Sequence, residues 1–160
     1  MKRLAVFLLV LGMSQAHADG GRLAVPENAK WKEECGSCHI TFPPKLLTAD
    51  NWQKMMGGLD KHFGANAALD AKENQEILDF LTRNAASGAR YSSASLRISD
   101  TPWFKREHRE VSAKEWGHSE VKSRANCTAC HINTANIGRG IWSERDIRMP
   151  GGRRGEDDDN

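Results

Sequence analysis

Residues 106–131 read REHREVSAKEWGHSEVKSRANCTACH, and the last five of them form the pattern C-x-x-C-H. The pattern occurs once more, as CGSCH at residues 35–39, and the two copies contain all four cysteines of the chain. In this pattern each thiol can add to one vinyl group of a haem, and the histidine that follows lies under the iron as its proximal ligand. The spacing therefore predicts two covalently bound haem c groups. The attachment and proximal residues are Cys35, Cys38 and His39 in the first copy and Cys127, Cys130 and His131 in the second.

Three other uses of four cysteines explain the sequence less well. Two disulfides are common in exported proteins, but they leave the histidine after each cysteine pair unexplained. A four-cysteine zinc site usually holds its pairs within about 15–20 residues of each other, whereas 88 residues separate Cys38 from Cys127. A thioredoxin-like redox pair requires a βαβ context, and no segment shows a β-strand pattern.

Residues 1–18 have the features of a cleavable secretory signal. A basic start is followed by an apolar run from Leu4 to Met13 and by a small-residue ending at Ala18. The run is about half of the ~20 residues that span a bilayer, so a retained anchor is the less favoured alternative. We expect cleavage after Ala18, export to the periplasm and no transmembrane span in the mature chain.

The charge balance of the mature chain is neutral. Cleavage removes two of the 23 basic residues and none of the 21 acidic ones, which leaves 21 of each. A neutral exported chain gives no reason to expect a nucleic acid as partner. The hydrophobic content of 39% predicts a thin core, which a large apolar cofactor would extend.

The periodicity predicts an all-α fold with two small helical haem domains, residues 19–86 and 87–150, and long irregular connections. In the first domain we expect helices over residues 26–39, 48–56 and 70–84. The last of these places Ile77, Leu78 and Leu81 on one face. Residues 84–95, which are small and polar, read as a linker.

In the second half, the stretch Ser99-Asp100-Thr101-Pro102 predicts a helix start with Pro near the first position, and Ser112 with Glu115 forms a capping-box candidate. A last helix is expected from Val121 to Cys130, where it would deliver the second haem. Residues 151–160, GGRRGEDDDN, are expected to be a disordered tail.

The second axial position of each iron decides between an electron carrier and an enzyme. A carrier fills both positions, whereas an enzyme or a gas sensor leaves one open. After signal removal five histidines remain, and two are proximal, so three are left for two distal positions. For the first haem His62 is the favoured distal ligand because Leu59 and Phe63 flank it. Met55 and Met56 are the alternatives.

For the second haem three residues are candidates for the distal position. His108 lies near Trp103 and Phe104, which can wall an apolar pocket. His118 follows a glycine in a polar turn, and Met149 lies only 18 residues after His131. The residues alone place His108 modestly ahead of His118, with Met149 third.

Several segments, in their order along the chain, resemble the small bacterial dihaem cytochromes c, a family abbreviated DHC. The resemblance covers roughly residues 31–150. It is carried by CGSCHITFPPKLL, DNWQKMMGGLDKHFG, EILDFL, TPWFKREHREV, EVKSRANCTACH and IRMP.

The resemblance implies two α-helical haem domains, each with an iron held by two histidines. Matched position by position, these ligands fall on His39 with His62 and on His131 with His108. The positions of His118 and Met149 carry no ligand in that pattern.

The resemblance also implies a non-enzymatic periplasmic electron carrier with two low-spin haems. Its partners would be a membrane cytochrome of the b561 type as donor and a soluble haem protein as acceptor. The best-known acceptor of this kind is the oxygen-binding sphaeroides haem protein. The alternative is a small haem enzyme (a peroxidase or a nitrogen-oxide reductase) or a gas-binding sensor, with one open or labile iron site.

Overall fold

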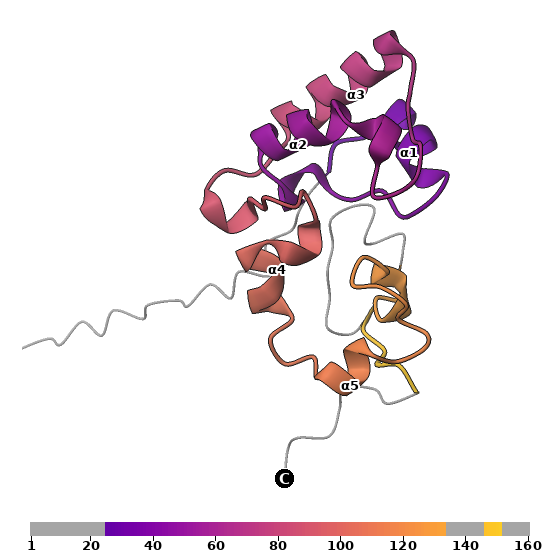
Figure 1. Cartoon of the computed structure of the whole chain (residues 1–160), viewed down its shortest axis with the longest axis vertical. Coiled ribbons are helices and arrows are strands. Elements are labelled where there is room, and N and C mark those ends of the chain that lie inside the picture. The colour runs from indigo at the N-terminus through magenta and orange to yellow at the C-terminus, as the bar shows by residue number, and fades with distance from the viewer. Residues whose placement is uncertain (1–24, 134–145, 152–160) are drawn as a thin grey trace, which may run out of the picture.

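The computed structural model describes residues 25–133 and 146–151 (Figure 1). Within these residues no β-strand forms, and only three isolated bridges pair extended residues, so the predicted all-α class is confirmed. The predicted signal, residues 1–18, and residues 152–160 of the predicted tail lie outside the described ranges. The α-helices are α1 (Ala29–Gly36), α2 (Ala49–Met56), α3 (Ala71–Arg83), α4 (Pro102–Glu107) and α5 (Ala113–Trp116).

The starts of the first three helices follow from their capping residues. The hydroxyl of Thr48 accepts a hydrogen bond from the backbone N–H of Asn51 at the start of α2. The carboxylate of Asp70 does the same for two N–H groups at the start of α3. Both helices match their expected ranges. Helix α1 is shorter than expected at both ends, because Asn28 caps it through the N–H of Trp31 and it ends at Gly36.

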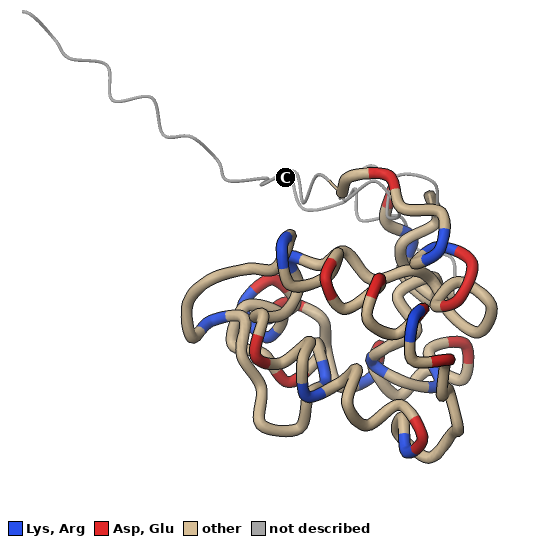
Figure 2. The backbone as a smooth tube through the Cα atoms, turned by 90° about the horizontal axis from the view of Figure 1, so that it is seen from above, with Lys and Arg blue, Asp and Glu red and all other residues tan. Residues whose placement is uncertain are grey.

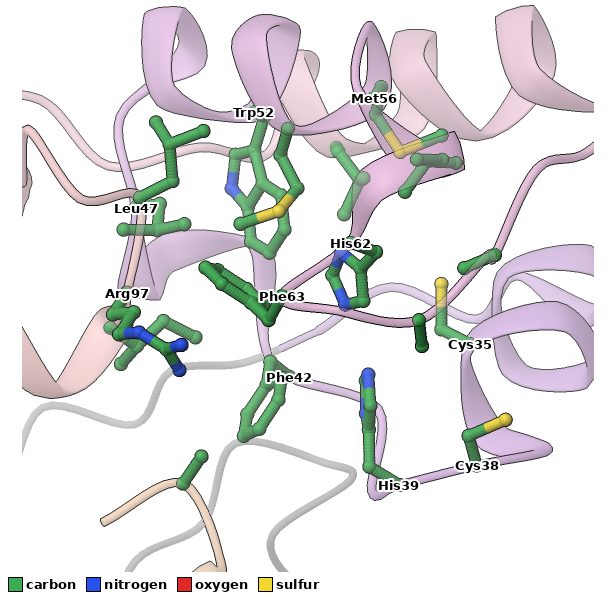
Figure 3. Close-up of a pocket in the computed structure, with 18 of the residues that line it drawn as sticks. Cys35, Cys38, His39, Phe42, Leu47, Trp52, Met56, His62, Phe63 and Arg97 are labelled. Carbon is green, nitrogen blue, oxygen red and sulfur yellow. The ribbon is translucent and has the colours of Figure 1, made fainter. Parts of the chain in front are cut away.

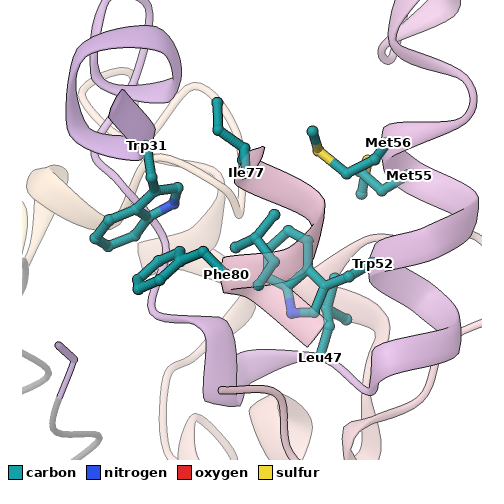
Figure 4. Packing of buried hydrophobic residues seen from close by; sticks show 8 residues of the cluster. Trp31, Leu47, Trp52, Met55, Met56, Ile77 and Phe80 are labelled. Carbon is teal, nitrogen blue, oxygen red and sulfur yellow. The ribbon is translucent and has the colours of Figure 1, made fainter. Parts of the chain in front are cut away.

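One hydrophobic core joins α1, α2 and α3 (Figure 4). The ring of Trp31 on α1 lies 5.2 Å from that of Phe80 on α3, centre to centre. Ile77 and Leu81, two of the residues predicted to share a face, are fully buried here, and Leu78 packs against the edge. The buried cluster consists of Trp31, Leu47, Trp52, Met55, Met56, Ile77, Phe80 and Leu81.

The predicted linker is tied to the first half. The N–H of Ala86 donates to the carbonyl of Leu47 at 2.9 Å. The buried side chain of Asn51 donates to the carbonyl of Ser93 at 2.6 Å and accepts from the hydroxyl of Ser92 at 2.9 Å. The domain boundary at residues 86 and 87 remains a prediction, but the chain beyond it is attached to α2.

The second half is less regular than expected. Thr101 caps α4 with Pro102 at the first helical position, and Ser112 with Glu115 forms the expected capping box of α5. The expected helix over residues 121–130 is wrong: Lys122 has φ +58°, and only Cys127–Ala129 forms a single 3-10 turn.

Local side-chain hydrogen bonds explain the missing helix. The amide of Asn126 donates to the carbonyls of Glu120 and Val121, and the hydroxyl of Ser123 accepts from the N–H of Ala125. Such bonds offer the backbone an alternative to helical pairing. The second C-x-x-C-H motif therefore lies on a series of turns.

Charged residues are interspersed along the described chain, and no long stretch of it carries one sign only (Figure 2). Among the described residues, no helix combines the length and the apolar character that a bilayer span requires.

Candidate haem sites

The first C-x-x-C-H motif borders an apolar cavity of about 440 Å³ (Figure 3). Its cysteines and histidine lie at the end of α1, and the opposite wall comes from α2 and from the turn that carries His62. This volume lies within the usual range of small-molecule and cofactor pockets. The sequence-predicted residues of the first site, Cys35, Cys38, His39 and His62, all line it.

The rings of His39 and His62 face each other across this cavity (Figure 3). Their centres lie 6.2 Å apart and their planes form an angle of 30°. Two metal–nitrogen bonds of about 2 Å, plus the short distance from each nitrogen to its own ring centre, require a separation of roughly 6 Å. The pair therefore fits one iron between the two rings.

The two rings differ in the hydrogen bonds that their Nδ1 atoms make. The Nδ1–H of His39 donates to the carbonyl of Ile40 at 2.6 Å, which leaves Nε2 as the nitrogen with a free electron pair. Nδ1 of His62 is buried and has no hydrogen-bond partner within the described chain. His62 therefore lacks the second hydrogen bond that metal-ligating histidines usually make, and its place in the site is indicated by the ring spacing.

At the second site His108 and His131 come together, although they lie near opposite ends of the stretch 106–131. Their ring centres lie 6.1 Å apart, with an interplanar angle of 80°. This separation again fits two metal–nitrogen bonds. The two sites thus share a spacing but differ in the relative orientation of their rings.

Helix α4 holds His108 in two ways. The Nδ1–H of His108 donates to the carbonyl of Phe104 at 2.9 Å, and the two rings stack at 3.9 Å with an angle of 17°. Because the carbonyl fixes the proton on Nδ1, Nε2 is free for a metal. His108 ends α4 as its C-cap.

The segment 146–151 holds His131 in place through backbone pairing with residues 130–132. His131 pairs with Ile147 in an antiparallel bridge. The N–H of Ile132 donates to the carbonyl of Asp146, and the N–H of Arg148 donates to that of Cys130. Sequence reasoning gave this segment no such role.

Burial lowers the pKa of His62, His108 and His131, which favours the neutral ring that metal ligation requires. It lowers the pKa of His131 to about 4, with His108 adding to the effect and Asp146 opposing it. It also lowers the pKa of His108, against the hydrogen bond to Phe104. Burial lowers the pKa of His62 as well, and His39 adds to this.

The surroundings of Cys35 and Cys127 favour an uncharged sulfur atom. Burial raises the pKa of Cys35 to about 11 and that of Cys127 to about 11, so both thiols stay protonated. All four cysteines lie in the described ranges, and none forms a disulfide. Across these ranges no three His, Cys, Asp or Glu side chains gather where they could hold a bare metal ion. A thioether to haem, which carries no charge, suits such surroundings.

The alternative distal ligands lie elsewhere or have other roles. Met55 and Met56 belong to the buried core, although both also reach the wall of the first cavity. Nδ1 of His118 accepts a hydrogen bond from the N–H of Glu120, and its Nε2 lies near Gly151. Met149 is half-buried in the segment 146–151.

The structure adds neighbours that the sequence did not indicate. Trp103, expected beside His108, lies instead 5.9 Å from the ring of Tyr91. Trp116 takes the place near His108, at 5.9 Å between ring centres. Arg97 lines the first cavity with its guanidinium over the ring of Phe63. These contacts join residues far from their motifs in sequence or fall in irregular turns, so no periodic signal could have found them.

An all-α chain with two C-x-x-C-H motifs, each with a second histidine about 6 Å from the motif histidine, defines the class of multihaem c-type cytochromes. The family model for dihaem cytochrome c matches residues 31–138. The chain belongs to the dihaem cytochrome c family, and membership implies two haem groups attached through the C-x-x-C-H cysteines.

Solved structures of dihaem cytochromes c are similar to this chain. The diheme cytochrome c of Shewanella baltica OS155 is 33% identical, with a TM-score of 0.69, over 81% of this chain and 98% of its own. Dihaem cytochrome c from Rhodobacter sphaeroides is 38% identical, with a TM-score of 0.62, over 74% of this chain and 99% of its own. No curated protein matches the chain.

Proposed function

We propose that the chain is a periplasmic electron carrier with two low-spin haems, each iron ligated by two histidines. His39 and His62 would hold the first iron, and His131 and His108 the second. The chain would not be an enzyme, since both axial positions of each iron are then filled. The mature protein would begin at Asp19, after a cleaved signal peptide.

The observation that carries this proposal is the spacing of the histidine pairs. Ring centres 6.2 Å apart at the first site and 6.1 Å apart at the second match what one iron between two imidazoles requires. An iron held by two histidines changes little in structure when it gains or loses an electron, which suits a carrier.

When bound, each haem supplies a one-electron exchange between ferric and ferrous iron, with no bond made or broken. The residues fix the rings: the carbonyls of Ile40 and Phe104 accept the Nδ1–H of His39 and His108. Two histidines donate more electron density to iron than histidine with methionine, which favours the ferric state and a low potential.

Carbon monoxide tests the closed coordination of both irons. The dithionite-reduced holoprotein is expected to keep its low-spin absorption bands when carbon monoxide is added, because no axial position is free. A pyridine haemochrome assay on the same sample is expected to give two haems c per chain. A rapid, complete spectral shift at either haem would instead favour the enzyme or gas-sensor alternative.

We also propose partners of the kind that the resemblance implies. A membrane cytochrome of the b561 type would donate electrons, and a soluble haem protein resembling sphaeroides haem protein would accept them. Electron-transfer complexes bury little surface, so docking to either partner would be small and transient. Stopped-flow mixing of the reduced chain with the oxidised acceptor is expected to show rapid transfer, which slows as salt is added.

A further inference from the structure

The first cavity and a second one beside His108 share part of their walls. The first cavity reaches into the second half of the chain, where Phe104, Arg124 and Cys127 line it. A second cavity of about 260 Å³ lies beside His108 and Trp116. Among the described residues, Phe104 and Arg124 are the two that line both cavities.

Arg124 brings a positive charge to this shared wall. Its guanidinium carbon lies 5.0 Å from the centre of the Trp116 ring, and that ring lies 5.9 Å from the ring of His108. Within the described parts of the chain no carboxylate pairs with Arg124. An arginine stays charged at every physiological pH, so Arg124 brings a full positive charge to this wall.

Arg97 offers a similar cation at one site only. Its guanidinium carbon lies 4.2 Å from the centre of the Phe63 ring, and it lines the first cavity but not the second. It too lacks an acidic partner among the described residues. The chain therefore contains one cation, Arg124, that lines the first cavity and the cavity beside His108, and another, Arg97, that lines the first cavity alone.

A nearby positive charge favours the ferrous form of a haem iron, because that form carries one positive charge fewer than the ferric form. Both arginines are exposed, so solvent and salt screen part of the effect. The expected influence on each potential is therefore moderate in size, and its direction is fixed by the sign of the charge.

We propose that Arg124 is a cation shared by the two haem sites, where it raises the reduction potential of both irons, whereas Arg97 raises that of the first iron alone. The proposal rests on the proposed function, since it requires a haem at each site. Arg124 then sets the common level of the two potentials, and Arg97 contributes to the difference between them.

Redox titration of the holoprotein tests this assignment. The ferric signals of the two haems are followed separately by electron paramagnetic resonance, because ring angles of 30° and 80° give the irons different anisotropies. Arg124→Gln is expected to lower the ferrous-to-ferric ratio at a fixed poise two- to tenfold at both haems, about 18–59 mV for a one-electron couple. Arg97→Gln is expected to produce such a shift at the first haem alone.

Two further variants separate charge from packing. Arg90 also lies over a ring, 4.8 Å from the centre of Tyr91, but lines neither cavity, so Arg90→Gln is expected to leave both potentials unchanged. Arg124→Lys keeps the charge and is expected to keep both potentials close to those of the native protein.

Each remaining outcome overturns the proposal. A shift at one haem or at neither in Arg124→Gln shows that the charge is not shared, and an equal shift in Arg90→Gln shows that position does not matter. Haem count and spin state are read from the same native sample. If that sample lacks two low-spin haems, the proposed function fails, whereas two low-spin haems with potentials insensitive to Arg124 defeat this inference alone.

Discussion

At the scale of single residues, His108 and His118 are ten positions apart and differ in how their rings are engaged. His108 directs its Nε2 toward the second site because its Nδ1–H is bonded to Phe104. We predict that His108→Ala leaves the second haem high-spin, because one axial ligand is lost. The absorption and electron paramagnetic resonance spectra of the ferric holoprotein measure this.

His118→Ala is the matched control for that variant. Its ring is bonded locally to the N–H of Glu120 and lies beside Gly151, so the spectrum is expected to change little. If His118→Ala becomes high-spin and His108→Ala does not, the distal ligand has been assigned to the wrong histidine.

The sequence predicted the site residues unevenly. The cysteines and proximal histidines could be assigned directly, because covalent attachment fixes their spacing to five consecutive residues. The proposed distal histidines follow no such rule. In both pairs 22 residues lie between the two histidines, but His62 follows its motif histidine, whereas His108 precedes His131. Their placement depends on the path of the intervening turns, so the residues alone gave His108 only a small advantage.

At the scale of elements, a helix could be predicted where a strong capping side chain marks its first turn. The conformation of the stretch from Val121 to Cys130 could not be predicted. Asp70, Thr101 and Ser112 each cap a helix where a helix start was expected, because a cap satisfies backbone groups within four residues. The expected last helix failed because Ser123 and Asn126 bond to nearby backbone groups instead, a competition that helical periodicity does not register.

Asn51 on α2 connects two segments of the chain through hydrogen bonds of its side chain. It is 4% exposed and joins α2 to the segment after α3 through Ser92 and Ser93. We predict that Asn51→Ala lowers the free energy of unfolding by about 2–4 kcal/mol, since buried partners lose their hydrogen bonds. Guanidinium chloride unfolding of the holoprotein, followed by circular dichroism, measures the change.

Gln75 on α3 provides the control for that substitution. It is exposed and bonds only to Asp79, one turn further on. Gln75→Ala is therefore expected to change the unfolding free energy by less than about 0.5 kcal/mol. Equal losses in the two variants would mean that Asn51 does not tie the segment to α2.

At the scale of the whole molecule, the apolar core is unevenly divided. Of the buried hydrophobic residues described, only Phe104 and Val121 follow residue 100. The eight-residue core cluster lies entirely in the first half (Figure 4). A polypeptide with so little apolar burial seldom folds without a cofactor or another cross-link, so we predict that the second half depends more strongly on its haem than the first.

Removing the second attachment site tests this dependence. In the double variant Cys127→Ser with Cys130→Ser, mass spectrometry is expected to find one covalent haem in place of two. Amide hydrogen exchange is then expected to be fast over residues 102–131, while α2 and α3 keep their protection, because their core does not involve the second haem.

The matching variant Cys35→Ser with Cys38→Ser is expected to leave α2 and α3 partly protected by that same core. Loss of protection throughout the chain in the first variant would show that both halves unfold as one unit, and full protection of residues 102–131 would show that the second half needs no haem.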